Sequence, residues 1–171
     1  MLVRAAYTIA FLCLVGAAGW GLHGVLTTQD DDGFLQWRDP AVTAAGRVLY
    51  ASHCASCHGM PDGSVKPTVN TSAKAPPLHD ASGHTWEHPD FALFQLVRDG
   101  VAVANCVPLD PELMPKFKGI VSDAELVAIL SYIKSTWPRA VRQNHDRVNM
   151  MYGPYNRAVR KLIDTGSGEH G

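Results

Sequence analysis

The apolar residues between positions 42 and 50 repeat with the period of an α-helix. They fall at i, i+3, i+4, i+7 and i+8 and share one helix face: Val42, Ala45, Gly46, Leu49 and Tyr50. Asp39 is a good N-cap, and Pro40 suits the first helical position, where its missing N–H is not needed. The pattern therefore predicts a helix from Pro40. Because Gly46 has no side chain, we expect it to let another helix approach closely.

A second amphipathic helix is predicted near the other end of the same region. Ser122–Glu125 is a capping box, in which a hydroxyl and a carboxylate satisfy free amide groups of the first turn. The apolar face that follows consists of Leu126, Ile129, Leu130 and Ile133, with Tyr132 beside it. Pro138 cannot continue a helix, so we expect the segment to end at Trp137. Two helices that each need a partner should pack together, with Tyr50 near Leu130 and Ile133.

Between these two helices the sequence predicts a third helix and a long loop. The helix starts at Pro89–Asp90 and stops at Gly100. Its apolar residues are Phe91, Phe94, Leu96 and Val97. Residues 60–88 are rich in Pro, Gly, Ser and Thr, which is typical of irregular structure. A loop this long in a small domain needs a reason, and enclosing a bulky group is one.

The amino-terminal segment is apolar enough to enter a membrane. Arg4 is followed by the uncharged run Ala5–Leu22, whose roughly 18 residues can just cross a hydrocarbon core of about 30 Å. The small residues Gly16–Ala18 would also suit the cleavage site of a signal peptide. We favour the retained anchor over the cleaved signal. Either way, the rest of the chain is expected on the far side of the membrane.

The charge balance says little in total but is unevenly distributed. Fifteen basic and 16 acidic residues give a net charge of −1, and no basic patch with interleaved aromatic residues indicates nucleic acid. Residues 30–32 are all aspartate, whereas the carboxyl end is basic. We expect a signal anchor or signal peptide at 1–26, a linker at 27–37, one domain at 38–138 and a basic carboxyl-terminal extension at 139–171.

The segment Cys54-Ala55-Ser56-Cys57-His58 carries the chemistry. Cys-x-x-Cys-His is the attachment signal of a c-type haem: two thiols one helical turn apart add to the vinyl groups of one porphyrin, and the histidine binds the iron. A bare Cys-x-x-Cys could instead be a redox pair or half of a zinc site. A redox pair of this kind occurs in a βαβ unit, and the sequence around Cys54 shows no such pattern. A zinc site needs a second pair of Cys or His ligands, whereas Cys13 and Cys106 stand alone. Cys106 is then expected to be an inert thiol.

Four features in order resemble the class I c-type cytochromes. They are Gly46–Tyr50, the haem motif, Met114–Phe117 and a last helix over Leu126–Trp137. More narrowly, the chain resembles bacterial monohaem cytochromes c that are membrane-anchored or exported, and His84–Asp90 looks like a segment of that group. The resemblance implies an all-α, class I cytochrome c fold. Three to four helices and long loops surround one covalent haem c with its iron, and a hydrophobic helix precedes them.

The resemblance assigns the sixth iron ligand to Met114, opposite His58. Pro115 pushes Met114 toward an extended conformation, so its thioether would be presented from a loop. Phe117 can lie along the porphyrin. The alternative is that Met114 has no ligand role and only fills space in the hydrophobic core.

Other candidates for the sixth position are weaker. Met60 follows His58 too closely for the chain to pass around the macrocycle. Met150 and Met151 fall beyond the last predicted helix. The three histidines of the loop could each ligate iron, and their bunching raises the idea of a second metal: His79, His84 and His88. Pro89 disfavours the regular helix that such a site would use.

Iron held by His58 and Met114 has no open position, so we expect outer-sphere transfer of one electron and no enzyme activity. The expected partners are redox protein donors and acceptors, without nucleic acid or a small-molecule substrate. The expected location is the bacterial inner membrane with the haem domain on the periplasmic side, or else the periplasm. The alternatives are an electron-transfer subunit or haem enzyme of peroxidase or dehydrogenase type with an open sixth position, and a gas-binding sensor. The early position of Cys54 disfavours the sensor.

Overall fold

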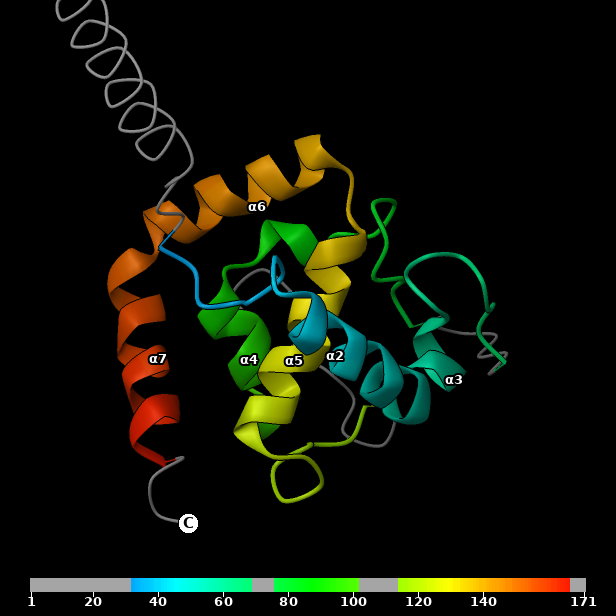
Figure 1. The fold of residues 1–171 in the computed structure, drawn as a ribbon, viewed down its shortest axis with the longest axis horizontal. Coiled ribbons are helices and arrows are strands. Elements are labelled where there is room, and N and C mark those ends of the chain that lie inside the picture. Colours follow the sequence, from blue (N-terminus) through cyan, green and yellow to red (C-terminus); the bar gives the residue numbers. More distant parts are fainter. Residues whose placement is uncertain (1–31, 69–75, 102–113, 167–171) are drawn as a thin grey trace, which may run out of the picture. The chain divides into compact units, whose positions relative to one another are not determined.

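A computed structural model of the 171-residue chain describes residues 32–68, 76–101 and 114–166 (Figure 1). These residues form six α-helices and one 3₁₀ helix and contain no β-strand: α2 (Pro40–His53), α3 (Ala55–His58), η1 (Thr85–Glu87), α4 (Asp90–Asp99), α5 (Asp123–Thr136), α6 (Arg139–Met151) and α7 (Gly153–Gly166). The all-α prediction is therefore confirmed. The predicted anchor Ala5–Leu22, Cys13 and Cys106 lie outside the described residues.

The capping signals of α2 and α5 act as the sequence predicts. The Asp39 carboxylate accepts a hydrogen bond from the Ala41 amide at 2.8 Å, and Pro40 opens α2. Ser122 and Glu125 form the full capping box at the start of α5. The helix ends at Thr136, directly before Trp137 and Pro138. Local side-chain chemistry thus determines where both helices begin and end.

Helices α2 and α5 cross in close contact at Gly46 (Figure 1). A Cβ atom placed on Gly46 would lie only 2.0 Å from the Ala128 carbonyl oxygen, so this residue lets the two backbones meet. The Tyr50 ring packs edge-on against Tyr132 with a centroid distance of 5.7 Å, within the core that also holds Leu130 and Ile133. The predicted close approach at Gly46 is confirmed. Ala45, which the pattern assigned to the same apolar face, is exposed.

Helix α4 forms where Pro89 and Gly100 predicted it. Gly100 ends the helix with a positive φ of 69°, a left-handed conformation that favours glycine. Its buried apolar side chains are Ala92, Leu93 and Phe94. Leu93 was not among the apolar residues expected for this helix, and Phe91, Leu96 and Val97 are only half-buried. The buried residues therefore differ from those expected: Leu93 is added, while Phe91, which stacks on Tyr155 of α7, keeps part of its surface exposed.

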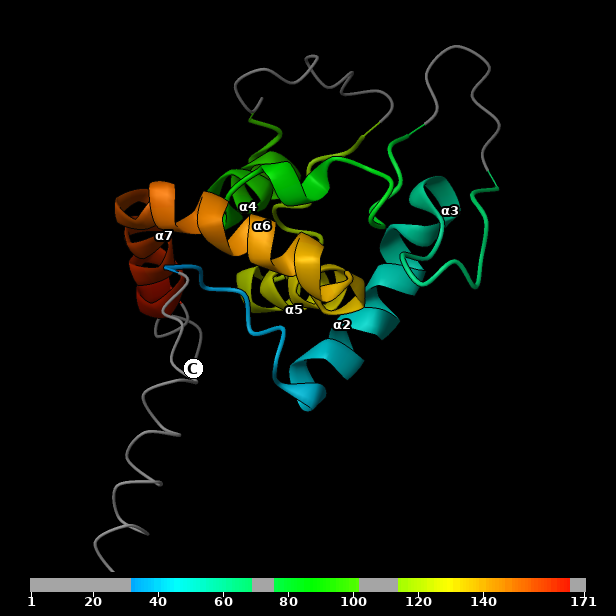
Figure 2. The same ribbon diagram turned by 90° about the horizontal axis from the view of Figure 1, so that it is seen from above.

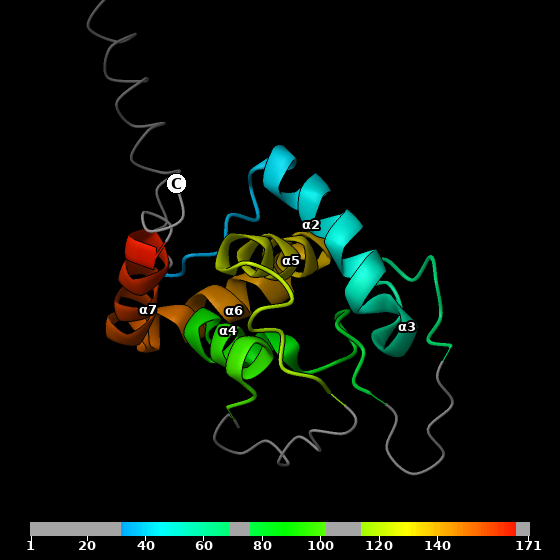
Figure 3. The same ribbon diagram turned by 90° about the horizontal axis from the view of Figure 1, so that it is seen from below.

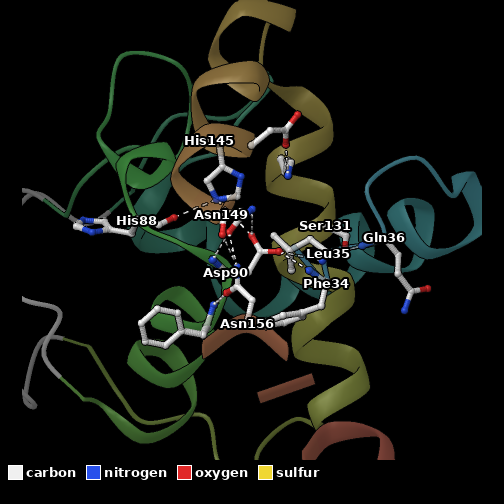
Figure 4. Close-up of polar contacts among 12 residues, drawn as sticks. Phe34, Leu35, Gln36, His88, Asp90, Ser131, His145, Asn149 and Asn156 are labelled. Atoms are coloured by element: carbon white, nitrogen blue, oxygen red, sulfur yellow. Dashed lines mark hydrogen bonds and ion pairs between the residues drawn. The ribbon is translucent and has the colours of Figure 1, made fainter. Parts of the chain in front are cut away.

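The described part of the carboxyl-terminal extension is folded against the domain. Figures 1 and 2 show α6 running from the end of α5 and α7 turning back beside α4. Between them lies a buried polar network centred on Asp90, whose carboxylate accepts hydrogen bonds from the amides of Phe34 (2.7 Å) and Leu35 (3.1 Å) and from the Asn149 side chain (3.0 Å; Figure 4). Although the predicted division at residue 138 stays a prediction, α6 and α7 pack on the same core.

Helices α3 and α7 lie at opposite ends of this folded unit in all three views (Figures 1–3). None of the helices in the described ranges is both long enough and apolar enough to span a bilayer.

Candidate haem-binding site

The two predicted haem cysteines lie at the junction of α2 and α3. Cys54 follows the last residue of α2, and its amide donates to the Tyr50 carbonyl at 2.9 Å. The Cys54 carbonyl in turn accepts a hydrogen bond from the His58 amide at 2.9 Å, so Cys54, Cys57 and His58 share one helical turn. Both thiols are free and half-buried. The sequence spacing therefore becomes two sulfur atoms and an imidazole presented by one short helix.

The His58 ring is held by a backbone carbonyl far along the chain. Its Nδ1 atom lies 2.7 Å from the Pro77 carbonyl oxygen, and the residue is buried. Since a carbonyl can only accept, Nδ1 must carry the proton, which leaves the lone pair on Nε2. This contact orients the ring and selects the tautomer that binds iron, as partners of metal-bound histidines commonly do. Burial lowers the pKa of His58, which further favours the neutral ring.

The electrostatics of Cys54 do not suit a redox pair. Burial, with a smaller contribution from Cys57, raises the pKa of the Cys54 thiol to about 12. Reactive cysteines of Cys-x-x-Cys oxidoreductases have lowered pKa values, because the thiolate is the nucleophile. The surroundings of Cys54 thus favour a protonated thiol at neutral pH. This observation argues against the thioredoxin-like alternative.

His79 forms part of the wall behind His58. The two rings stack with a centroid distance of 4.3 Å and an interplanar angle of 28°. The Trp137 indole donates to the His79 carbonyl at 2.8 Å, and the His79 Nδ1 lies 2.8 Å from the Thr85 hydroxyl. Burial lowers the pKa of His79 to about 3, so this ring is neutral at physiological pH. The sequence pointed to His79 only as a member of a loop cluster, because no local pattern indicates its contact with His58.

Tyr50 closes another side of the motif. Its hydroxyl donates to the Gly59 carbonyl at 2.9 Å, directly after the haem motif, and the side chain is fully buried. Burial is also the main cause that raises the Tyr50 pKa, so the hydroxyl stays protonated. The contact joins α2 to the backbone that follows α3. It was not expected from the sequence, which assigned Tyr50 only to the α2–α5 interface.

Met114 is the first residue of the described range 114–166 and lies half-buried against the core, at the start of the loop 114–118. This segment is tied to the end of α4, since the Phe117 amide donates to the Val97 carbonyl and the Lys118 amide to the Arg98 carbonyl, both at 3.0 Å. Phe117 is buried and packs edge-on against His53. Met114 thus lies in a loop, as predicted, and the ties of this loop to α4 were not expected from the sequence. The role of Met114 as an iron ligand stays a prediction.

The competing ligands lie in other surroundings. Met60 is buried in the core, two residues beyond His58. Met150 and Met151 are exposed near the end of α6. His84 and His88 pack edge-on at 5.5 Å from each other, whereas His79 stacks on His58. In the parts of the chain that the structure describes, no group of three or more His, Cys, Asp or Glu side chains is arranged to hold a metal ion.

The donor set of α3 fits a covalent haem. It offers two thiols one turn apart, an imidazole with its Nε2 lone pair available, and a surrounding core that includes Tyr50, Met60 and Phe117. A bulky apolar group with two thiol-reactive carbons and one iron satisfies all of these features at once. Fold and site together define a c-type cytochrome domain.

Comparison with known families gives the same class. Residues 41–133, more than half of the chain, match the family model described as "Cytochrome C oxidase, cbb3-type, subunit III". The chain belongs to this family, and its domain is an electron-transfer module that binds covalently attached haem c with its iron. No curated protein and no solved structure matches the chain significantly.

Proposed function

We propose that this chain is a monohaem cytochrome that transfers one electron at a time between protein partners. Cys54 and Cys57 form the thioether bonds to the haem, and His58 and Met114 are the axial ligands of its iron. The observation that carries the proposal is the hydrogen bond from His58 Nδ1 to the Pro77 carbonyl at 2.7 Å, which leaves Nε2 available for iron. The anchored loop that holds Met114 supplies the second donor.

The residues of the site suit electron transfer rather than substrate turnover. With imidazole and thioether in place, both axial positions are filled, and a methionine ligand raises the reduction potential. Pro77 and the stacked His79 restrict rotation of the His58 ring, and the ties of Phe117 and Lys118 to α4 restrict the Met114 loop. Ligands held rigidly change geometry little between oxidation states. The protein's part is therefore to position the ligands and to exclude water.

We further propose that Ala5–Leu22 anchors the protein in the bacterial inner membrane with the haem domain on the periplasmic side. The support is the uncharged length of this segment and the fact that haem attachment to Cys-x-x-Cys-His requires export in bacteria. The family description names a subunit of a terminal oxidase, so an oxidase is the first electron acceptor to test. Small-molecule substrates and nucleic acids are not expected as partners.

Met114→Ala tests the ligand assignment. The variant should keep its covalent haem, lose the weak far-red iron–sulfur band of the oxidised protein and have a lower reduction potential, because the thioether favours ferrous iron. Visible spectroscopy with a redox titration measures all three. Met150→Ala, which removes an exposed methionine, should change none of them. An unchanged far-red band in Met114→Ala would instead assign the sixth position to another residue.

The same spectra decide the alternative function. A haem enzyme with an open sixth position would bind cyanide rapidly in the ferric wild-type protein, whereas a His/Met-ligated cytochrome should bind it slowly. Rapid binding already in the wild type would favour the enzyme.

The covalent attachment has its own test. The double variant Cys54→Ala/Cys57→Ala should show no haem after denaturing electrophoresis and haem staining, because both thioether bonds are lost. Cys106→Ala, expected to be an inert thiol, should stain as the wild type does. Staining that survives in the double variant would contradict the assignment of these two cysteines.

A further inference from the structure

Two residues of one loop hold the ring of His58. The Pro77 carbonyl oxygen lies 2.7 Å from its Nδ1 atom, and the His79 ring covers one of its faces at a centroid distance of 4.3 Å. Residues 77–84 form bends and turns rather than a helix. Such a loop can orient the His58 ring only as well as the loop itself is held. The contacts that hold the loop therefore determine the geometry of His58.

Trp137 holds this loop at His79. Its indole Nε1 donates to the His79 carbonyl at 2.8 Å, across 58 positions of the sequence. Trp137 is only 2% exposed, so its indole is shielded from water. On the imidazole, the His79 Nδ1 atom lies 2.8 Å from the Thr85 hydroxyl. The His79 ring is thus held through its backbone by Trp137 and through its side chain by Thr85.

Helix α6 in turn fixes Trp137. The Arg142 guanidinium donates to the Trp137 carbonyl, and the His145 ring packs edge-on against the indole at a centroid distance of 5.1 Å. The buried pair of Lys134 and Asp146, 2.7 Å apart, ties α5 to α6. All of these residues lie beyond the part of the chain that matches the family model. The position of the indole therefore depends on the helix that follows the matched region.

We propose that Trp137 is a positioning residue for electron transfer, which keeps His79 against His58 and so orients the ligand ring and excludes water from it. This inference rests on the proposed role of His58 as an axial ligand. Residues around a metal-bound histidine tune the metal through ring orientation and solvent access. If His79 is released, water reaches the uncovered face of His58 and stabilises the more highly charged ferric state. Loss of the Trp137 contact should therefore lower the reduction potential.

Trp137→Phe in the full-length, haem-loaded protein tests the proposal, because it removes the indole N–H and keeps an aromatic ring. Two readouts report on the ligand rather than on stability. They are the reduction potential and the NMR shifts of the haem methyl groups in the ferric protein, whose order depends on the orientation of the axial ligands. The variant should change the methyl pattern and raise the ferric-to-ferrous ratio at a fixed solution potential by at least about threefold. At 59 mV per tenfold change for one electron, this equals about 30 mV.

Trp86→Phe is the matched control. The Trp86 indole donates to the Gly83 carbonyl at 2.9 Å, so this substitution removes the same kind of hydrogen bond from the same loop. Because that bond involves neither His79 nor His58, the reduction potential and the methyl pattern should stay those of the wild type. A Trp86→Phe variant that shifts both readouts as far as Trp137→Phe does would indicate a general effect on the loop and overturn the proposal.

Two substitutions of the half-buried His79 test the ring itself and stay decisive if Trp137→Phe does not keep its haem. His79→Ala keeps the carbonyl that accepts from Trp137 but removes the ring on His58, so it should lower the potential and change the methyl pattern. His79→Phe restores a flat ring and should keep both readouts closer to those of the wild type. Unchanged readouts in His79→Ala, or equal shifts in the two variants, would contradict the stacking role and with it the proposal.

The outcomes separate a failed positioning role from a failed ligand assignment. A Trp137→Phe protein that keeps its haem, its potential and its methyl pattern would overturn the proposal, even if it unfolds at a lower temperature, because Trp137 would then have only a structural role. Ferric wild-type protein without strongly shifted ring protons from His58 would instead show that His58 does not bind the iron. That result would disprove the proposed function before any variant is compared.

Discussion

At position 46 the missing side chain sets the distance between α2 and α5. A Cβ atom there would lie 2.0 Å from the Ala128 carbonyl oxygen and 3.0 Å from the Tyr132 Cβ, and neither belongs to the end of a flexible side chain. The close contact brings Tyr50 against Tyr132 and positions Tyr50 to hold the Gly59 carbonyl behind the haem motif. One absent methyl group therefore supports both the helix pair and the site.

Gly46→Ala should destabilise the protein, although alanine is the better helix former by about 1 kcal/mol. Overpacking against a backbone costs typically about 1–3 kcal/mol and here forces the two helices apart, so the steric cost outweighs the gain. Denaturant unfolding of the haem-loaded protein measures the change. Ala45→Val, on the exposed side of the same helix, should change stability by less than about 1 kcal/mol. A Gly46→Ala variant as stable as the wild type would show that the helices can separate at little cost.

At the scale of single elements, the start of α5 depends on a reciprocal cap. The Glu125 carboxylate accepts hydrogen bonds from the Ser122 amide at 2.7 Å and from its hydroxyl at 2.8 Å, while the Ser122 hydroxyl accepts from the Glu125 amide. The two bonds from Ser122 lower the pKa of Glu125, the backbone bond being the larger cause. Ionised Glu125 therefore stabilises the folded state.

Glu125→Gln should lower stability at neutral pH, and the difference from the wild type should shrink in acid. A carboxylate whose folded pKa is depressed stabilises the protein above its ordinary pKa, 4.5 here, and this contribution is lost as the pH falls through the lower folded value. Unfolding measured between pH 7 and pH 3 gives the profile. In a Ser122→Ala background the same substitution should have a smaller effect at pH 7. An equal effect in both backgrounds would mean that the Ser122 hydroxyl adds nothing to the bond from the Ser122 amide, which alanine keeps.

The sequence identified the ends of helices better than their buried faces. Asp39, Ser122 and Gly100 mark helix ends because caps act through hydrogen bonds and backbone conformations that are local. The exposure of Ala45 and the burial of Leu93 depend on which neighbour covers each helix. The helical period of the apolar residues gives their spacing along the helix. Which side of the helix is buried depends on how the neighbouring helices pack against it.

At the scale of the whole molecule, buried polar contacts join the carboxyl-terminal helices to the haem-bearing part. The Lys134 ammonium on α5 lies 2.7 Å from the Asp146 carboxylate on α6, and both side chains are almost fully buried. His145 Nε2 lies 3.0 Å from the His88 carbonyl, next to η1 and α4 (Figure 4). Breaking the Lys134–Asp146 pair would leave one charge buried, so the helices α6 and α7 should unfold together with the rest.

Asp146→Ala should therefore destabilise the protein by about 3–5 kcal/mol, because it leaves Lys134 buried without this carboxylate. Asp62→Asn removes a partner from the exposed Arg47–Asp62 pair and should cost less than about 1 kcal/mol. Thermal unfolding followed by circular dichroism and by haem absorbance measures both variants. A loss in Asp146→Ala that is confined to helical signal, with haem absorbance unchanged at the same temperature, would show that α6 and α7 unfold independently.

The sequence by itself determined the covalent chemistry, the helix ends and the all-α class, because each depends on residues within a few positions of one another. Cys54, Cys57 and His58 are close along the chain in any conformation. Only the tertiary structure brought the Pro77 carbonyl to His58, stacked His79 on the same ring and folded α6 and α7 onto α4 and α5. The Pro77–His58 contact joins positions 19 residues apart, the Asp90–Asn149 contact 59 and the Phe91–Asn156 contact 65, and all of them depend on which surfaces remain to be buried once the helices pack. No local pattern carries that information.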